Sequence, residues 1–339
     1  MKALFLTRYG LSINKNVKFF EREIDDPKRD EVRIETYAAG LNPIDQKIIF
    51  GLALIIMKPK RPFPLGFDLA GIVVKKGDAV TDLNIGDKVY SKVPWDQMGT
   101  ISEQILVRAN MVALKPKNTT FAAAAGLPLV ACTVLDSFQV ANIKKGSKIL
   151  IHAGSGGIGT FAIQYAKYLG AYVYTTTSTK NVALVKSLGA DVVIDYKKQD
   201  YRKIVKDLDV VYDTLGRKYT RQALSVIKKG GKIISIAGHH DDATLKKVGI
   251  SKFFRILFQI KGSILMYRMK RKGVFYKHVW SYPNKKKLNY IRVLIESEKI
   301  KPVNDKEFPF EKAAEALAYL RTNRAKGKVT IKIKEAVIS

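Results

Sequence analysis

The sequence predicts an α/β protein in which a β-rich domain is joined to a second domain built on a doubly wound parallel sheet. First, at 339 residues the chain is longer than one hydrophobic core usually supports, so two domains are expected. Second, short strand patterns separated by turns fill residues 1–120, whereas strand and helix patterns alternate from residue 146 onward. Third, the glycine-rich run 152–159 lies between an apolar strand and an amphipathic helix, as in doubly wound sheets.

The strands expected in the first domain are short and bounded by turn residues. Gly66, Gly71, Gly77 and Gly86 punctuate them, as is typical of a compact β domain. A helical region, 121–140, then leads into the second domain. The expected strands are Lys2 to Thr7, Val17 to Glu21, Glu31 to Ala38, Leu69 to Val74, Lys88 to Val93 and Ile105 to Leu114.

The second domain is expected to alternate strands with helices, which is the pattern of a parallel sheet with helical crossovers. In the helix expected over 181–188, for example, Val182, Val185 and Leu188 fall on one side. The expected strands are Lys148 to Ile151, Tyr172 to Thr176, Val192 to Ile194, Val210 to Tyr212, Lys232 to Ile236 and Phe275 to Val279.

Residues 251–272 interrupt this alternation because they mix apolar with basic side chains, as a basic amphipathic insertion does. Such a helix can press its apolar side into a membrane interface while its lysines meet anionic lipid. Alternatively, its apolar side packs over a ligand cleft or a subunit interface, which we favour. Beyond Pro283 we expect a helix to about Ser297, a second helix over 311–321 and a final strand over 328–334.

Composition restricts location and partners. Lys and Arg total 60 against 30 acidic residues, and the resulting charge of +30 attracts nucleic acid, anionic lipid and phosphorylated ligands. Most of the excess is Lys, and we recognise no nucleic-acid-binding module, so weak association with such polyanions is the expectation. Because Cys132 is the single cysteine and no apolar run is long enough to cross a bilayer, we expect a cytoplasmic protein, peripheral to the membrane if the insertion binds lipid.

The spacing Gly154-x-Gly156-x-x-Gly159 predicts a dinucleotide pyrophosphate site. It supplies a tight turn, bare backbone where phosphate approaches, and close packing of helix against strand. The helix amides then face the anion. An ordinary strand-to-helix turn is the alternative. The expected cofactor contacts are Gly154, Ser155, Gly156, Gly157, Ile158 and Gly159.

The segment after the second strand of this domain predicts NADP(H) as the cofactor. An acidic residue usually holds a free ribose 2′-hydroxyl there, but this chain has hydroxyl side chains and Lys180 in the run 175–180. We therefore expect Ser178 and Lys180 to contact a 2′-phosphate, with Tyr196 as a supporting donor. The alternative is a solvated loop with a capping serine.

Motifs spread over nearly the whole chain resemble the zinc-free quinone oxidoreductase branch of the medium-chain dehydrogenase/reductase superfamily, which is related to zeta-crystallin. The resemblance implies a GroES-like catalytic domain over 1–123 and 284–339, and an NADP-binding Rossmann domain over 124–283 that contains the insertion. The motifs are Asn42-Pro-Ile-Asp45 with Lys47, Pro64-Leu-Gly-Phe-Asp-Leu-Ala-Gly71, Gly86-Asp-Lys-Val89, the glycine run, Leu188-Gly-Ala-Asp191 through Tyr196, and Gly327-Lys-Val-Thr-Ile331.

The resemblance also implies where the remaining cofactor contacts and the catalytic groups lie. Ala237 and Gly238, at the end of the fifth strand, are expected near the nicotinamide, and Gly216 after the fourth strand allows close cofactor approach. His239, the next residue, is either a proton donor or, as we favour, part of a polar loop. The candidate catalytic residues are Asn42, Asp45 and Thr133, with a turn and a buried helix-start hydroxyl as their structural alternatives.

We expect no metal. Zinc-dependent relatives use cysteine and histidine ligands, and the positions that correspond to their zinc-binding Gly-His-Glu are Gly66, Phe67 and Asp68. Without a Lewis acid for an alkoxide, the resemblance implies hydride transfer from NADPH to a quinone or to the conjugated double bond of an α,β-unsaturated carbonyl. A homodimer is implied because relatives commonly form one. The alternatives are a membrane-surface reductase of lipophilic quinones or oxidised lipids, and a nucleic-acid-binding protein.

Overall fold

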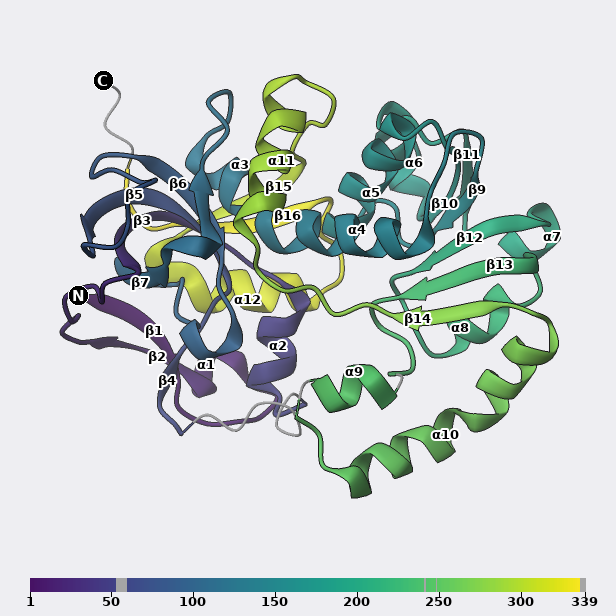
Figure 1. Cartoon of the computed structure of the whole chain (residues 1–339), viewed down its shortest axis with the longest axis horizontal. Helices are drawn as coiled ribbons and strands as arrows, with labels where there is room; N and C mark the ends of the chain where they lie inside the picture. Colours follow the sequence, from purple (N-terminus) through teal and green to yellow (C-terminus); the bar gives the residue numbers. More distant parts are fainter. Residues whose placement is uncertain (53–59, 241, 248, 336–339) are drawn as a thin grey trace. The chain divides into compact units, whose positions relative to one another are not determined.

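The computed structural model describes residues 1–52, 60–240, 242–247 and 249–335 and has the predicted α/β fold class (Figure 1). The chain forms two compact units, Met1–Cys132 with Tyr282–Ser339, and Thr133–Ser281. The first break thus lies after Cys132 rather than after residue 123. The reason is that α3 (Phe121–Ala125) packs on the first unit's sheet, where a Cβ added at Gly40 would lie 2.1 Å from the carbonyl oxygen of Ala125.

The first unit contains two sheets. The larger has seven strands in the order β15-β16-β3-β5-β6-β8, with β7 paired to β3, and the smaller has the order β2-β1-β4. Figure 1 shows the C-terminal strands β15 and β16, in yellow, which form one edge of the larger sheet. The strands are β1 (Lys2–Leu6), β2 (Val17–Glu21), β3 (Glu31–Gly40), β4 (Phe63–Pro64), β5 (Asp68–Lys76), β6 (Lys88–Lys92), β7 (Gln104–Arg108), β8 (Val112–Leu114), β15 (Asn304–Pro309) and β16 (Lys328–Lys332).

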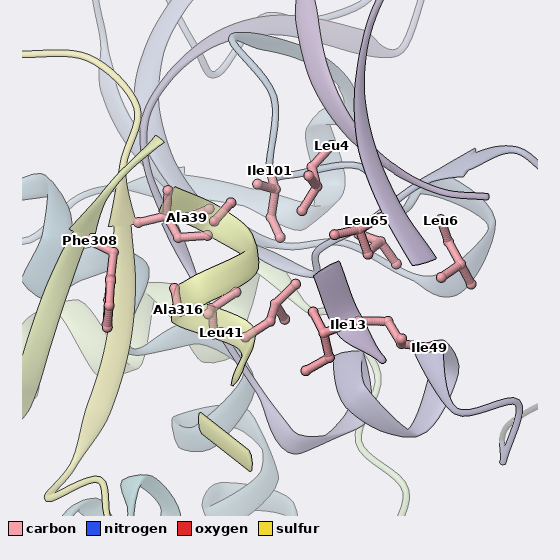
Figure 2. Close-up of a cluster of buried hydrophobic side chains, with 14 of the residues drawn as sticks. Leu4, Leu6, Ile13, Ala39, Leu41, Ile49, Leu65, Ile101, Phe308 and Ala316 are labelled. Atoms are coloured by element: carbon pink, nitrogen blue, oxygen red, sulfur yellow. The ribbon is translucent and has the colours of Figure 1, made fainter. Parts of the chain in front are cut away.

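A buried apolar cluster holds the N-terminal and C-terminal segments of this unit together (Figure 2). Leu4 of β1 and Leu41 after β3 are 1% exposed, and Ala316 of the C-terminal helix α12 is fully buried beside them. Burial of such side chains stabilises a fold by roughly 1.5–3 kcal/mol for each large one. The unit's helices are α1 (Ile13–Asn16), α2 (Pro43–Ile49), α3, α11 (Lys285–Glu296) and α12 (Ala313–Arg321), with the short 3-10 turns η1 (Trp95–Gln97), η2 (Ala109–Met111) and η4 (Phe310–Lys312).

The predicted strand over 105–114 is wrong as a single element. The structure has β7 and β8 there, with η2 between them. The physical reason is that β7 pairs with β3 whereas β8 pairs with β6, so the chain must turn between the two partners. The amide of Ala109 secures this corner by donating to the carbonyl oxygen of Asp30.

The second unit is a parallel six-stranded sheet in the order β11-β10-β9-β12-β13-β14, as expected of a doubly wound fold. All six predicted strands are present, and their ends differ from the expected ones by at most five residues. Ligands of such sheets bind outside the carboxyl ends of the strands, beside β9 where the strand order reverses. The strands are β9 (Lys148–Ile151), β10 (Tyr172–Thr177), β11 (Val192–Asp195), β12 (Leu208–Asp213), β13 (Ile227–Ser235) and β14 (Phe275–His278).

Helices cover both faces of this sheet (Figure 1). On one face, Phe138 packs against Tyr165 and against Tyr212 of β12, with ring centroids 5.8 and 5.4 Å apart. On the other, Val211 joins a buried cluster with Met269. The helices are α4 (Pro128–Ala141), which begins in the first unit, α5 (Gly157–Tyr168), η3 (Thr179–Asn181), α6 (Val182–Ser187), α7 (Tyr201–Ile204), α8 (Lys218–Ala223), α9 (Asp242–Lys247) and α10 (Lys252–Arg271).

The predicted insertion is the helix α10, the longest of the described helices. Within the part of the chain that the structure describes, no helix combines the length and the apolar character that a bilayer span needs.

Candidate functional site

The glycine-rich turn connects β9 to α5 with very close backbone packing. A Cβ added at Gly154 would lie 2.1 Å from the Thr175 hydroxyl, and one added at Gly159 would lie 2.4 Å from the carbonyl oxygen of Ala153. Ala153 itself has a left-handed φ of 52°, which strains a residue with a side chain. Gly154 and Gly159 are therefore required by the turn itself, as their spacing predicts.

Gly156 is different because its missing side chain leaves open space. A Cβ there would meet only the carbonyl oxygen of Ala153, at 3.4 Å. Gly156 is also the N-cap of α5, and because it has no side chain it cannot accept a hydrogen bond from the first backbone amides of the helix. The residues present thus fit a dinucleotide pyrophosphate. Gly156 leaves room for a phosphate at the N-terminus of α5, where the first backbone amides of the helix have no side-chain acceptor.

Ser155, within this turn, is held by two residues that the motif did not predict. Thr177 at the end of β10 donates to the Ser155 hydroxyl oxygen at 3.0 Å, and the Asn181 amide donates to it at 2.9 Å. The turn is therefore tied to the segment after β10. Asn181 is 5% exposed. The sequence signal that would have found it is an asparagine that closes the hydroxyl-rich run 175–180.

The residues predicted to contact a 2′-phosphate lie at the adjacent carboxyl ends of β10 and β11. Ser178 follows β10, Lys180 is exposed in η3, and the amide of Tyr196 donates to the carbonyl oxygen of Thr177 at 3.0 Å. The structure brings the segments of Ser178 and Tyr196 together, and Tyr196 is 59% exposed. Contact of the three side chains with a phosphate stays a prediction.

The carboxylate beside this segment, Asp195, is already engaged. Thr179 donates to it at 2.6 Å, and the amide of Lys197 donates at 3.0 Å. The hydrogen bond from Thr179 lowers the pKa of Asp195 below its usual range, so the group is ionised at neutral pH. The carboxyl end of β10 itself carries Thr177 and Ser178 instead of an acid.

A buried carboxylate organises the next two loops. Asp213, at the end of β12, accepts hydrogen bonds from the amides of Leu215 and Gly216 at 3.1 and 2.8 Å, and from the hydroxyls of Thr220 and Ser235 at 2.5 and 3.1 Å. Burial raises the pKa of Asp213, but donors that include His152 outweigh burial, so its pKa lies below the usual range.

These bonds place Gly216 against Ala237 and Gly238. Gly216 has a φ of 70°, and a Cβ there would lie 2.1 Å from the carbonyl oxygen of Ala237. The amide of Gly238 in turn donates to the Ser235 hydroxyl at 2.7 Å. The structure thus brings Gly216, predicted to allow close cofactor approach, against Ala237 and Gly238, predicted near the nicotinamide. Asp213 is the positioning residue that the sequence prediction missed.

Asn42 and Asp45 lie together in the first unit, at the start of α2. The backbone amide of Asn42 donates to the Asp45 carboxylate at 2.7 Å, and the two residues form a capping box. The Asn42 side chain donates to Asp68 at 2.8 Å and accepts from Lys328 at 2.6 Å. Asn42, Asp45 and Asp68 are fully buried, and Lys328 is 6% exposed.

This enclosure gives Asn42 and Asp45 a role in holding the chain that enters α2. The Asn42 amide nitrogen and oxygen already have partners in Asp68 and Lys328. Their predicted place beside the nicotinamide stays a prediction. Thr133, the third candidate, is a buried residue of α4 and the first residue of the second unit. Its predicted place opposite Asn42 stays a prediction as well.

The charges in this cluster are strongly coupled. Burial raises the pKa of Asp45 to about 7, and the negative charge of Asp68 adds to that rise. Burial also raises the pKa of Asp68 and lowers the pKa of Lys328. The Lys328 ammonium lies 3.7 Å from the Asp68 carboxylate and donates to the carbonyl oxygen of Leu41 at 2.7 Å. It compensates the nearest buried negative charge.

The position that corresponds to the zinc-binding motif is therefore filled by protein contacts. Asp68 accepts from Asn42, and it also accepts from the amide of Leu129 at 3.0 Å, while Phe67 packs in the apolar cluster of Figure 2. Among the described residues, no three His, Cys, Asp or Glu side chains gather as a metal ion requires.

Asp45→Asn is expected to flatten the pH dependence of stability. The folded pKa of about 7 lies above the unfolded value of about 3.9, so the folded protein binds more protons between these values. This contribution to stability is complete below about pH 4 and is lost as the pH rises through 7. Melting temperatures of the wild type should fall from pH 5 to 8 relative to those of the variant, which keeps an acceptor for the Asn42 amide.

The exposed Asp82 of the same unit offers a control, because Asp82→Asn removes the same charge from a surface ion pair with Lys285. The melting temperature of Asp82→Asn should change with pH in the same way as that of the wild type. If the melting temperature of Asp45→Asn also followed the pH dependence of the wild type, the raised pKa of Asp45 would be contradicted.

Comparison with known proteins gives a consistent set of similarities. Residues 28–117 match the family model described as the alcohol dehydrogenase GroES-like domain, and residues 188–331 match that of the zinc-binding dehydrogenase. The chloroplastic NADPH-dependent alkenal/one oxidoreductase of Arabidopsis thaliana and the 2-methylene-furan-3-one reductase of Solanum lycopersicum are each 36% identical over 98% of this chain and 79% of the relative. The quinone oxidoreductase of Coxiella burnetii superposes with a TM-score of 0.86, 29% identity and coverage of 98% and 99% of the two chains.

Proposed function

Because the chain belongs to the medium-chain dehydrogenase/reductase family, in its quinone oxidoreductase branch, we propose that it is an NADPH-dependent, zinc-independent reductase of quinones or of conjugated enals and enones. The observation that carries the proposal is the end of the parallel sheet. There the glycine-rich turn is bonded through Ser155 to Thr177 and Asn181, on either side of Ser178 and Lys180, and no free carboxylate follows β10.

The residues of the second unit bind and orient the cofactor in this proposal. The α5 amides and Gly156 receive the pyrophosphate, while Ser178 and Lys180 receive the 2′-phosphate. Gly216, Ala237 and Gly238, fastened by Asp213, hold the nicotinamide end. NADPH supplies the hydride when it is bound.

The acceptor chemistry follows from the enclosure of the acids near the candidate catalytic positions, because Asp45 is fully buried and Asp68 is paired with Lys328. A quinone or an enone spreads the charge that arrives with the hydride over a conjugated system, so the reaction proceeds without a Lewis acid. One proton completes the reduction to a hydroquinone or a saturated carbonyl compound. We assign that proton to water, because Asn42 and Asp45 are enclosed and Asp68 is paired with Lys328.

Lys180→Ala is expected to weaken NADPH binding about tenfold and leave NADH binding unchanged, because one charge-assisted bond to the 2′-phosphate is lost. Calorimetric titration with each cofactor measures this. The control is Lys186→Ala, which removes an equally exposed charge from α6 of the same unit. Equal weakening by both variants, or equal loss for NADH, would refute the assignment of Lys180.

The function itself is tested by NADPH oxidation. The purified chain should oxidise NADPH with at least one class among ortho-quinones, para-quinones, short enals and long-chain enones. Activity should persist with a metal chelator. Failure with every acceptor would overturn the reductase proposal, and loss of activity with chelator would overturn its zinc-independent part.

Assembly and location are separate proposals. We propose a homodimer in the cytoplasm, supported by the resemblance to oligomeric relatives and by the single cysteine. The Arabidopsis relative is described as chloroplastic. Sedimentation equilibrium measures the mass of the protein in solution. A monomer mass at micromolar concentration would contradict the proposed dimer.

A further inference from the structure

The helix α10 has two apolar faces, although a helix packed on a sheet needs only one. Its inner face contains the buried Gly262 and Met269, with Leu265 and Met266 packed against the core of the second unit. Its outer face carries apolar side chains three or four residues apart, so they form one continuous stripe. We call this the outer stripe: Phe253, which is 68% exposed, Leu257 at 47%, Ile260 at 64%, Ile264 at 70% and Tyr267 at 62%.

This exposure is concentrated in one place. With Phe254 and Ile256, α10 contributes seven of the exposed large apolar side chains among the described residues. Single exposed apolar residues are normal, but a contiguous row marks an interaction site. Figure 1 shows α10, in green, as one uninterrupted rod.

Basic side chains flank the outer stripe. Helical spacing places Lys252 and Lys270 on one flank and Arg268 on the other, and all three are exposed. Arg271 lies over the Tyr267 ring at 5.9 Å, which adds a cation to the end of the stripe. The segment 252–272 has seven Lys and Arg residues and no acidic residue.

The inner face fixes the helix in this orientation. A Cβ added at Gly262 would lie 2.2 Å from the His239 ring, so α10 packs closely against the loop after β13 at this glycine. The Gln259 amide donates to the carbonyl oxygen of His240 at 3.1 Å, and the His240 and Phe258 rings are 6.4 Å apart. The outer stripe is thus presented by a helix anchored to the second unit.

We propose that the outer stripe of α10 docks onto an anionic lipid surface. The apolar row enters the interface, and the flanking cations meet lipid phosphates, as interfacial helices do. A second copy of this chain fits less well, because a symmetric contact would bring the same basic flanks together without any acid from α10 to pair them. The convex helix surface also lacks the groove that an apolar peptide requires.

The test is co-sedimentation of the full-length protein with vesicles, without cofactor or substrate, so its outcome is independent of the proposed function. Vesicles of phosphatidylcholine with about 30% phosphatidylglycerol are compared with pure phosphatidylcholine. The wild type should partition at least tenfold more strongly onto the anionic vesicles. The double variant Ile260→Glu/Ile264→Glu should lose at least tenfold of that binding.

The matched control is Ile85→Glu, which adds a glutamate at an equally exposed isoleucine, 65%, of the first unit. It should bind vesicles within a factor of about three of the wild type, since it adds only one remote charge. Circular dichroism and thermal unfolding establish that each variant is folded, which is expected because all three isoleucines are exposed. An Ile260→Trp variant gives an independent readout, a blue shift of tryptophan emission on anionic vesicles.

Three results would overturn the proposal. The wild type fails to sediment with anionic vesicles at physiological ionic strength. Ile260→Glu/Ile264→Glu binds vesicles as well as Ile85→Glu does. Light scattering shows that the double variant dissociates a wild-type dimer while vesicle binding is unchanged, which would make the outer stripe a contact between copies.

Discussion

Replacing Lys328 by methionine is expected to destabilise the first unit by about 3–5 kcal/mol, the usual cost of removing one partner of a buried ion pair. Methionine fills much of the same volume, so the loss is electrostatic. The variant leaves the buried Asp68 carboxylate without its cation, and it leaves Asn42 and the Leu41 carbonyl without a donor. Urea unfolding followed by circular dichroism measures the difference.

Lys332 on the same strand provides the control. It pairs with Glu335 on the surface, so Lys332→Met should cost roughly 0–1 kcal/mol. The double variant Lys328→Met/Asp68→Asn should recover part of the loss, because the uncompensated charge is then absent. Equal stabilities of Lys328→Met and Lys332→Met would contradict the role of the buried ammonium.

Asp213→Ala is expected to cost the second unit about 3 kcal/mol or more and to weaken NADPH binding at least tenfold. It leaves the buried Thr220 hydroxyl and the Leu215 and Gly216 amides without their acceptor, and each such group costs about 1–3 kcal/mol. The loop that carries Ala237 and Gly238 loses its support at the same time. Thermal unfolding and calorimetric titration of NADPH check the two effects.

Two variants separate these effects from simple charge loss. Asp213→Asn keeps one oxygen for the amides, so it should lose less stability than alanine. Asp200→Ala removes a half-buried acid that pairs with Arg202 and caps α7, and it should cost about 1 kcal/mol with cofactor affinity unchanged. Cofactor affinity of Asp213→Ala equal to that of Asp200→Ala would refute the positioning role of Asp213.

Because Asp213 has a folded pKa below its usual range, its contribution is present above the unfolded value of about 3.9 and is lost as the pH falls below it. The contributions of Asp213 and Asp45 to stability therefore change with pH in opposite directions. Both directions follow from whether donors or burial dominate around each carboxylate.

The parts of this fold that could be predicted from the sequence are those formed by residues close together in the chain. The glycine turn was predictable because Gly154, Gly156 and Gly159 act within one turn and leave a fixed spacing. The Asn42 and Asp45 capping box is local in the same way. Asp213 was also within reach, since an acid that ends an apolar strand three residues before a glycine predicts a loop of this kind.

The remaining parts depend on pairing between distant segments. Lys328 meets Asn42 across 286 residues, and only the pairing of β16 with β3 brings them together. The corner at Ala109 arises because β7 and β8 choose different partners, which no local pattern records. Because α10 has apolar side chains on two faces, its sequence does not show which face is exposed. The burial of Met269 and Gly262 in the structure identifies the inner face and therefore the outer stripe.

The route of the chain through the two units determines the order in which they become complete during synthesis. Residues 133–281 leave the ribosome as one continuous stretch, so the parallel sheet can close while translation continues. The first unit cannot be completed until β16 emerges. Only then is the free edge of β3 paired and the buried Asp68 given its cation, Lys328. We therefore expect a nascent chain stalled before residue 328 to have a folded second unit and a protease-sensitive first unit, the reverse of the usual N-to-C progression.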